Sequence, residues 1–146
     1  MNQQQSTGRV YLVGAGPGNP ELITRKAIDL LREADVVFHD KLSPNELIQR
    51  YCSEDSEVRD VGKRKGKVGP DQEDINHMLT EAAHEYDTVV RLKGGDPLLF
   101  GRGGEEARHL TKHNVPFEIV PGVSSLLSVP GYAGIPATDR DHSSSM

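Results

Sequence analysis

The chain has 146 residues, a formal net charge of −5 and a pI near 5.6, which fits one domain and excludes the broadly basic surface of a nucleic-acid or anionic-membrane binder. Its single cysteine, Cys52, can form neither an internal disulfide nor a cysteine-rich zinc site. No apolar run approaches the roughly 18 residues of a membrane helix, and the polar start MNQQQSTG lacks the apolar core of a signal peptide, so we expect a cytoplasmic protein with no membrane partner.

The first part of the chain alternates between strand and helix patterns. Residues 10–14 (VYLVG) are a short run of β-forming apolar residues. Residues 19–34 carry apolar side chains close to a helical period, with Asn19 as the expected cap and Pro20 in the first turn. Residues 35–40 (DVVFHD) again have the composition of a strand, so the sequence predicts a first βαβ unit here.

A short helix is expected next, ending near Tyr51. Ser43 and Glu46 stand three residues apart, which is the spacing of a capping box at the start of this helix. Residues 56–61 (SEVRDV) then form the third predicted strand, which leads into the loop GKRKGKVGP.

The second half of the chain continues the alternation. It contains two strands at 88–92 and 117–120, a helix near 105–113, a last helical stretch after PGVSS, and a helix with the apolar stripe Ile75, Met78, Leu79 and Ala82. Five alternations of strand and helix predict βαβ units with right-handed crossovers. The expected fold class is therefore α/β, with an open, mainly parallel five-stranded sheet and helices on both faces.

The loops that follow the predicted strands differ in composition from those that follow the helices. The loops after helices are short, whereas the loops after strands hold glycine, proline and charge, at 14–18, 39–42, 62–69, 93–104 and 121–125. Because the carboxyl ends of parallel strands meet at one edge of the sheet, these loops should surround one cleft. Glycine allows close approach of backbone to a ligand, so this edge is the predicted binding site.

One of these loops, GAGPGN at 14–19, allows an alternative reading. A strand, a glycine turn and a helix, with Asp40 ending the next strand, are the order of a dinucleotide-binding fingerprint. Asn19 stands where that fingerprint has its third glycine, and Pro17 removes a backbone N–H from the turn. A non-catalytic dinucleotide-binding module therefore stays open as a second hypothesis.

Five motifs, in this order and spacing, together resemble the tetrapyrrole methylase family: GAGPGNPELITRKA, HDKL, VGKRKGK, RLKGGDPLLFGRGGEE and VPGVSS. The resemblance covers residues 10–145. It implies two α/β domains with S-adenosyl-L-methionine folded into the cleft between them, and a homodimer for the complete enzyme. On this basis residues 1–8 are expected to be a flexible tail, residues 9–146 the N-terminal domain, and the second domain absent from the chain.

The resemblance also implies which residues contact S-adenosyl-L-methionine. These are the residues whose positions match the motifs of the family: Pro17, Gly94, Gly95, Asp96, Leu99, Ser124 and Ser125. Physically, backbone groups freed by glycine can meet the cofactor, and Asp96 offers an acceptor for hydroxyl or ammonium donors. The alternative for Asp96 is a turn cap before Pro97.

By the same resemblance, Asp40 of HDKL is the expected proton acceptor and Lys63 of VGKRKGK the expected proton donor. The implied reaction transfers methyl groups to two pyrrole carbons of uroporphyrinogen III and gives precorrin-2, an intermediate of sirohaem and cobalamin biosynthesis. Sulfonium is a good leaving group, so catalysis would come from positioning and from proton management. Without the resemblance, Asp40 reads as a turn cap and Lys63 as a solvated charge.

The loop of Lys63 continues with Arg64, Lys65 and Lys67, which form a basic cluster in an acidic chain. A charge run is usually a solvated loop. Here it follows a strand beside the predicted cleft, where it could attract the carboxylates of uroporphyrinogen, with Arg102 and Arg140 as further candidates. No aromatic residue interleaves with the cluster, which disfavours nucleic acid as a partner.

The histidines and the cysteine of the chain do not form a recognisable catalytic or metal-binding motif. His109 and His113 share a helix face, but HLTKH lacks the glutamate of an HExxH motif, so an exposed face is expected and no metal is required. Cys52 has no motif around it and is expected to be an inert thiol. Relatives in the family methylate later cobalamin precursors, diphthine precursors or ribosomal RNA. VGKRKGK, together with FGRGGEE and the DRDH segment, favours uroporphyrinogen, and another acceptor is the alternative.

Overall fold

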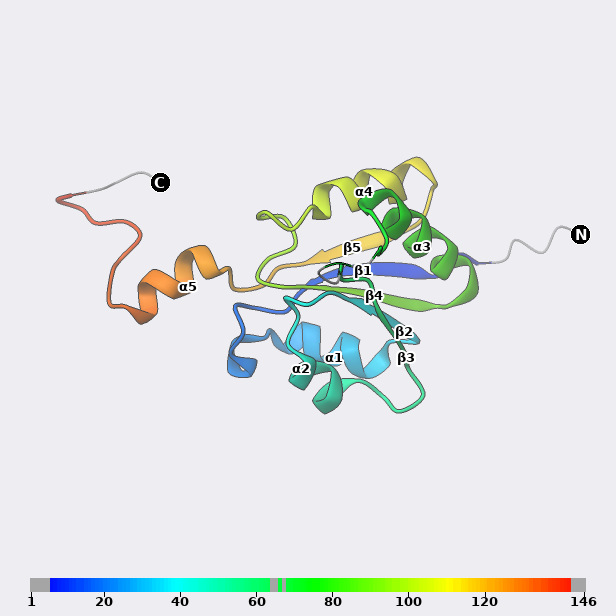
Figure 1. Cartoon of the computed structure of the whole chain (residues 1–146), viewed down its shortest axis with the longest axis horizontal. Helices are drawn as coiled ribbons and strands as arrows, with labels where there is room; N and C mark the ends of the chain where they lie inside the picture. The colour runs from blue at the N-terminus through cyan, green and yellow to red at the C-terminus, as the bar shows by residue number, and fades with distance from the viewer. Residues whose placement is uncertain (1–5, 64–65, 67, 143–146) are drawn as a thin grey trace, which may run out of the picture.

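The structure is a computed structural model that describes residues 6–63, 66 and 68–142. Its five strands are all parallel and lie in the order β3-β2-β4-β1-β5 (Figure 1). The strands are β1 (Arg9–Gly14), β2 (Val36–His39), β3 (Glu57–Asp60), β4 (Thr88–Lys93) and β5 (Phe117–Val120). The helices are η1 (Pro20–Leu22, a 3₁₀ turn), α1 (Arg25–Glu33), α2 (Asn45–Tyr51), α3 (Gln72–Glu85), α4 (Gly103–Lys112) and α5 (Ser125–Tyr132). The predicted α/β fold class is confirmed.

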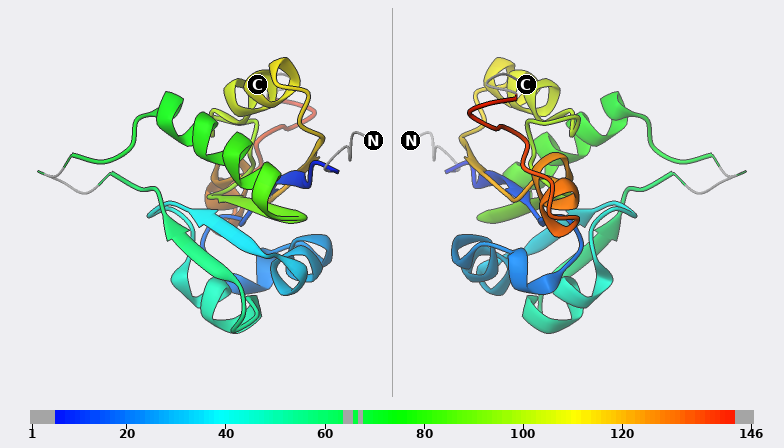
Figure 2. Two further views of the ribbon diagram at one scale, coloured as in Figure 1. Left: turned by 90° about the vertical axis from the view of Figure 1, so that its right-hand side faces the viewer. Right: turned by 90° about the vertical axis from the view of Figure 1, so that its left-hand side faces the viewer.

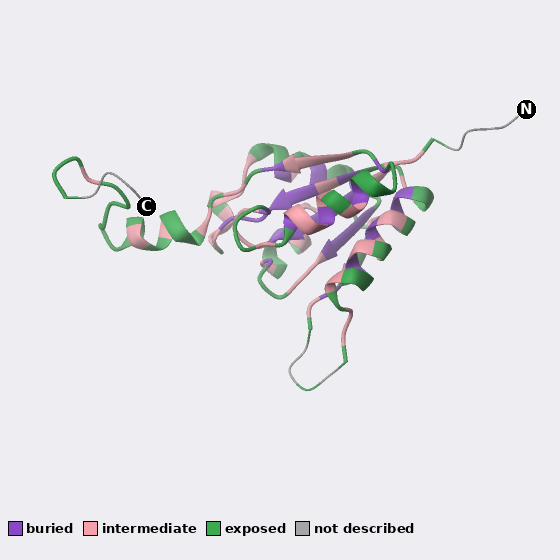
Figure 3. Cartoon of the chain, turned by 90° about the horizontal axis from the view of Figure 1, so that it is seen from above, coloured by how far each residue is buried: buried purple, intermediate pink, exposed green. Residues whose placement is uncertain are grey.

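Helices cover both faces of the sheet, with α1 and α2 on one side and α3 and α4 on the other (Figure 1). Side chains alternate along each strand, so each face has its own apolar core. Val90 and Leu92 pack with Leu31 of α1, whereas Val89 packs with Leu79 of α3. Strands β1, β2 and β4 are the most continuously buried part of the chain, as the buried class in Figure 3 shows.

The connections from the two central strands diverge. The chain leaves β1 toward α1 on one face of the sheet and leaves β4 toward α4 on the other face. A crevice forms where neighbouring parallel strands send their connections to opposite faces. Backbone hydrogen bonds between Gly16 and Gly95, with N···O distances of 3.2 and 2.7 Å, hold the two loops together at this point.

The start of the first helix differs from the prediction. Asn19 accepts a hydrogen bond from the Glu21 N–H, but it caps only η1. Ile23 and Thr24 are extended, and Thr24 is the cap of α1, accepting from the Ala27 N–H at 3.1 Å. Two capping side chains compete within six residues, and the second is the one followed by the amphipathic helix.

The predicted capping box at Ser43 and Glu46 is wrong. The N-cap of α2 is Pro44, and no side chain caps the helix. Ser43 is buried and its hydroxyl donates instead to the Leu92 carbonyl at 3.1 Å. The side chain therefore fixes the loop after β2 against β4, which places that loop at the carboxyl edge of the sheet.

The last helix, α5, lies beyond the carboxyl edge and away from the sheet layers (Figures 1 and 2). None of its residues is buried, and its apolar side chains include Leu127 at 52% and Tyr132 at 71% exposure. Within the described part of the chain, no helix has both the length and the apolar character needed to cross a bilayer.

Candidate active site

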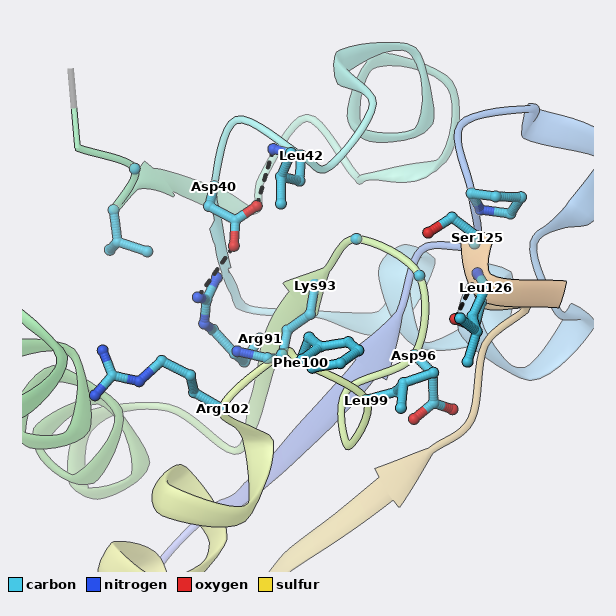
Figure 4. Close-up of a pocket in the computed structure, with 18 of the residues that line it drawn as sticks. Asp40, Leu42, Arg91, Lys93, Asp96, Leu99, Phe100, Arg102, Ser125 and Leu126 are labelled. Atoms are coloured by element: carbon cyan, nitrogen blue, oxygen red, sulfur yellow. Dashed lines mark hydrogen bonds and ion pairs between the residues drawn. The ribbon is translucent and has the colours of Figure 1, made fainter. Parts of the chain in front are cut away.

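A cavity of about 920 Å³ opens at the carboxyl edge of the sheet, between the loops after β1, β2, β3 and β4 and the start of α5 (Figure 4). Of the predicted site residues that the structure describes, all but Arg140 line it, namely Pro17, Asp40, Lys63, Gly94, Gly95, Asp96, Leu99, Arg102, Ser124 and Ser125. Arg64, Lys65 and Lys67 lie outside the described residues. Arg140 does not line the cavity and lies in the segment after α5.

Three glycines, Gly14, Gly95 and Gly122, cross beside the cavity, and two of them, Gly14 and Gly122, have no room for a side chain. A Cβ atom on Gly122 would lie 2.3 Å from the Gly95 carbonyl oxygen and 2.8 Å from the Gly14 Cα. A Cβ on Gly14 would lie 2.6 Å from the same oxygen. Gly95 also has a positive φ of 64°. The loops after β1, β4 and β5 can therefore meet because Gly14 and Gly122 carry no Cβ and Gly95 adopts a positive φ.

Asp96 joins two of these loops. Its Oδ1 accepts from the Leu98 N–H at 2.8 Å and its Oδ2 from the Gly122 N–H at 3.1 Å. The turn cap considered from the sequence is thus present, and it coexists with a place on the cavity wall. A carboxylate has about four acceptor sites, so two backbone bonds leave capacity for a ligand donor.

The segment between Asp96 and α4 is tightly coiled. Phe100 and Arg102 have positive φ angles of 55° and 58°, which are uncommon for residues with side chains. A Cβ on Gly103 would lie 2.4 Å from the Pro97 carbonyl oxygen, so the coil depends on that glycine. The ring of Phe100 is 95% exposed at the rim of the cavity. Strain of this kind is typical of ligand-binding segments.

Two of the predicted polar contacts already have partners within the chain. Ser124 caps α5, and its Oγ accepts from the Leu126 N–H at 3.2 Å. Arg102 makes two bonds to Glu105, at 2.9 and 2.8 Å. These hydrogen bonds raise the pKa of Arg102 and lower the pKa of Glu105. Both side chains are more than a third exposed, so a substrate carboxylate would compete with an ion pair in water.

Asp40 is held by both carboxylate oxygens. Oδ1 accepts from the Leu42 N–H at 3.0 Å, and Oδ2 accepts from Arg91 Nη2 at 3.3 Å. Figure 4 shows the Arg91 guanidinium reaching this carboxylate from the strand below. The Asp40 side chain is 26% exposed, so a fixed carboxylate faces the cavity.

A buried cluster of charges beneath Asp40 was not predicted. Arg91 and Lys93 are each 3% exposed and Glu106 is 0% exposed. Oε1 of Glu106 accepts from Arg91 Nε at 3.2 Å, from Lys93 Nζ at 2.9 Å and from Gln72 Nε2 at 3.2 Å. The signal in the sequence was the pair of cations two residues apart in a central strand, because buried charges need partners.

Lys93 has an unusual environment for a lysine. Burial lowers its pKa most, and the neighbouring Arg91 charge lowers it further. The Glu106 carboxylate acts in the opposite direction and raises it. Lys93 lines the cavity, so this ammonium and its carboxylate partner lie directly below the space that a ligand would fill.

His109 and His113 lie away from the cavity, where α4 packs on α3. The His109 ring lies 4.2 Å from the His113 ring and 4.9 Å from the His77 ring, centroid to centroid. His109 Nε2 is buried without a hydrogen-bond partner, so the predicted exposed face is wrong for this residue.

In the described ranges, no group of three His, Cys, Asp or Glu side chains could hold a metal ion. Burial raises the pKa of the Cys52 thiol.

The histidine cluster predicts a loss of stability in acid. Burial lowers the pKa of His109 most. The charges of His113, His77 and Lys112 lower this pKa further, and the charge of Glu73 raises it. The unfolded chain therefore binds more protons, and stability falls as the pH drops through about 6.5. We expect the Tm to fall by a few degrees between pH 7.5 and pH 5, and His109→Gln to flatten this slope. His84→Gln, on the exposed face of α3, should leave the slope unchanged; equal slopes in all three proteins would contradict the assignment.

The chain matches known proteins over nearly all of its length. The family model of the tetrapyrrole (corrin/porphyrin) methylases matches residues 9–146. The chain belongs to the tetrapyrrole methylase family. Uroporphyrinogen-III C-methyltransferase from Methanocaldococcus jannaschii is 57% identical over 134 residues, covering 92% of this chain and 55% of that protein.

Two further relatives match this tetrapyrrole methylase chain over most of its length. Siroheme synthase from Pseudomonas paraeruginosa is 48% identical over 97% of this chain and 30% of its own length. The crystal structure of uroporphyrin-III C-methyltransferase from Thermus thermophilus, complexed with S-adenosylhomocysteine, has a TM-score of 0.77 and 50% identity over 91% of this chain and 54% of that one. The chain thus spans about half or less of the length of these relatives.

The sheet order argues against the dinucleotide-binding alternative. In the dinucleotide-binding fold the strand carrying the ribose-binding acid lies next to the strand of the glycine loop. Here β4 lies between β1 and β2, so Asp40 does not end a strand adjacent to the loop at 14–19. The glycine loop also leads into η1, and α1 begins only at Arg25. The structure therefore lacks the arrangement that the fingerprint requires.

Proposed function

We propose that the chain forms a methyl-transfer site that uses S-adenosyl-L-methionine as donor and uroporphyrinogen III as acceptor, with precorrin-2 as the product. The observation that carries this proposal is the convergence of the motif residues from five loops on one cavity. The identities of 57% and 50% to enzymes named for uroporphyrinogen or uroporphyrin methylation support the choice of acceptor.

The methyl donor would occupy the side of the cavity formed by the loops after β1, β4 and β5. Pro17, Leu99 and the glycine pair at 94–95 supply apolar and backbone surface there. Asp96 and the start of α5 at Ser124 and Ser125 supply polar groups. This mixture suits a ligand with an adenine ring, hydroxyls and an amino-acid end. The relative from Thermus thermophilus was crystallised with S-adenosylhomocysteine, which is the demethylated donor.

The acceptor would lie on the side that carries Asp40 and Lys63. A pyrrole carbon attacks the methyl group, the C–S bond breaks with its electrons going to sulfur, and S-adenosylhomocysteine leaves as a neutral thioether. Asp40 would take up the proton that the methylated pyrrole releases, and Lys63 would return a proton to the macrocycle. Arg64, Lys65, Lys67 and Arg102 would attract the acceptor's carboxylates. A second transfer gives the dimethylated product.

The proposal includes three features of the complete enzyme that are predicted from the sequence analysis. A second domain would close the cleft from the side of α5, whose apolar side chains are exposed. The complete enzyme would be a homodimer, and it would act in the cytoplasm. Another tetrapyrrole acceptor, such as a later cobalamin precursor, stays the second candidate because fewer residues choose the acceptor than hold the donor.

Calorimetric titration with S-adenosylhomocysteine, followed by a methyl-transfer assay on uroporphyrinogen III, tests the proposal. We expect saturable binding by the chain and release of a dimethylated product. Binding without transfer to uroporphyrinogen III would favour another acceptor, and later cobalamin precursors should then be assayed in its place. Binding of NAD in place of S-adenosylhomocysteine would reject a methyl-donor site.

A further inference from the structure

Beneath the proposed site lies a cluster of charges to which the methyl-transfer reaction assigns no part. It consists of Arg91 and Lys93 on β4 and Glu106 on α4, with Gln72 of α3 as a neutral donor. Asp40, which directly follows β2 and belongs to the proposed chemistry, contacts this cluster through Arg91. The cluster therefore connects the proposed proton acceptor to the helix layer on one face of the sheet.

The charged side chains of this cluster are buried, which is unusual for the core of a protein. Arg91, Lys93 and Glu106 all have exposures of 3% or less. Removing charges from water is costly, and apolar residues of similar volume often give a core of equal stability. Strand β4 otherwise places Val89, Val90 and Leu92 in the two apolar cores. Charges retained at this depth, below a cavity, point to a role in the site.

The geometry of Arg91 shows what the cluster does. Its guanidinium uses three nitrogens in three directions: Nη2 donates to Asp40 Oδ2 at 3.3 Å, Nε to Glu106 Oε1 at 3.2 Å, and Nη1 to the Leu92 carbonyl at 3.2 Å. A planar group held at three points cannot turn freely. Contacts with α4 and β4 therefore fix the direction from which the Arg91 guanidinium approaches the Asp40 carboxylate.

Charge balance leaves Arg91 available to Asp40. Glu106 also accepts from Lys93 at 2.9 Å, so its single charge is shared between two cations. The cluster of two cations and Glu106 carries one excess positive charge, and the Asp40 carboxylate balances it. Because the Leu42 N–H holds the other oxygen of Asp40 at 3.0 Å, the carboxylate is held from two sides while it faces the cavity.

We propose that Arg91, anchored by Glu106, is a positioning residue for Asp40, fixing the orientation of the carboxylate that accepts the proton during methyl transfer. The inference rests on the proposed function, since Asp40 has a reacting partner only there. Arg91 acts through Asp40 and donates to no reacting atom. Lys93 completes the anchor because its Nζ donates a second charged hydrogen bond to Glu106 Oε1, at 2.9 Å.

The test compares Arg91→Gln and Arg91→Lys with the wild-type chain. We expect Arg91→Gln to lower kcat about 10- to 100-fold, the loss expected for a misplaced catalytic group. KM and the Kd for S-adenosylhomocysteine should change less than about twofold, because Arg91 donates hydrogen bonds to Asp40, Glu106 and the Leu92 carbonyl, none of which is proposed to hold the donor. Arg91→Lys should recover part of kcat. Arg59→Gln, which removes an exposed guanidinium paired with Glu57 on β3, is the matched control and should have no effect.

A double-mutant cycle separates positioning from general damage to the fold. If Arg91 acts through Asp40, then Arg91→Gln should add nothing to the loss of kcat caused by Asp40→Asn. Equal losses from Arg91→Gln in the presence and absence of the Asp40 carboxylate would overturn the proposal.

An NMR measurement on the chain without substrate keeps this test independent of the proposed function. The Leu42 amide proton reports on the bond to Asp40 Oδ1. We expect it to move upfield in Arg91→Gln, as in Asp40→Asn, and to stay in place in Arg59→Gln. If the wild-type chain transfers no methyl group, the proposed function fails while this signal still decides the positioning. An unchanged Leu42 signal in Arg91→Gln would reject it.

Discussion

Replacing Gly122 with alanine is expected to lower the free energy of unfolding by about 3 kcal/mol, or to prevent folding. The added Cβ would lie 2.3 Å from the Gly95 carbonyl oxygen and 2.8 Å from the Gly14 Cα. Both contacts are with backbone, so no side-chain rotation can relieve them. The loops after β1, β4 and β5 would have to separate beside the cavity. Urea unfolding followed by circular dichroism measures the loss.

Gly131 provides the matched control for this substitution. It lies in α5, nothing lies within 4 Å of the position that a Cβ would take, and its φ is not positive. Gly131→Ala should change stability by less than about 1 kcal/mol, in the stabilising direction, because alanine favours helix. Similar unfolding curves for Gly122→Ala and Gly131→Ala would show that the three-glycine crossing does not constrain the fold.

Gly122→Ala should also weaken binding of S-adenosylhomocysteine if the proposed donor site is right. The Gly122 N–H donates to Asp96 Oδ2 at 3.1 Å, so moving this loop displaces a residue of the donor wall. If Gly122→Ala folds and binds S-adenosylhomocysteine with unchanged affinity, then the crossing of the three glycines does not shape the donor site.

The sequence predicted the site better than it predicted the contacts within it. Loops that follow parallel strands must meet at one edge, so Pro17, Asp40, Asp96 and Ser124 could be placed together from the strand pattern alone. The strand order could not be read in this way, because each βαβ crossover can skip a strand. The position of β4 between β1 and β2 is what removes the dinucleotide-binding alternative.

The contacts that were missed depend on partners far away in the sequence. Ser43 has the local spacing of a cap, yet its hydroxyl bonds to Leu92, 49 residues away. Arg91 lies within the predicted strand at 88–92, and only the packing of α4 shows that Glu106 lies beside it. A local sequence pattern indicates a helix cap or a strand, whereas the tertiary fold determines which buried polar groups pair with each other.

Replacing Glu106 with glutamine should cost about 3–5 kcal/mol of stability at pH 7, the range for removing one partner of a buried ion pair. Glu106 is fully buried and is the carboxylate that both Arg91 and Lys93 contact. Glutamine keeps the shape of the side chain and removes its charge. The neighbouring Glu105 gives a close control, because its ion pair with Arg102 is exposed. Glu105→Gln should cost no more than about 1 kcal/mol in the same urea titration.

The pH dependence of the Glu106→Gln effect identifies the group responsible. The folded chain already lowers the pKa of Lys93 below its ordinary 10.5, and Glu106 is the neighbour that raises it most. Without Glu106 the pKa of Lys93 falls further, so the unfolded chain binds the extra proton and the stability of the variant rises with pH up to about 10.5. The difference in unfolding free energy between wild type and variant should therefore narrow from pH 7 to pH 10, as Lys93 releases its proton in the folded variant. A difference that does not change with pH would mean that Lys93 stays protonated in the folded variant without Glu106. The loss of stability would then come from the lost ion pair between Arg91 and Glu106 alone.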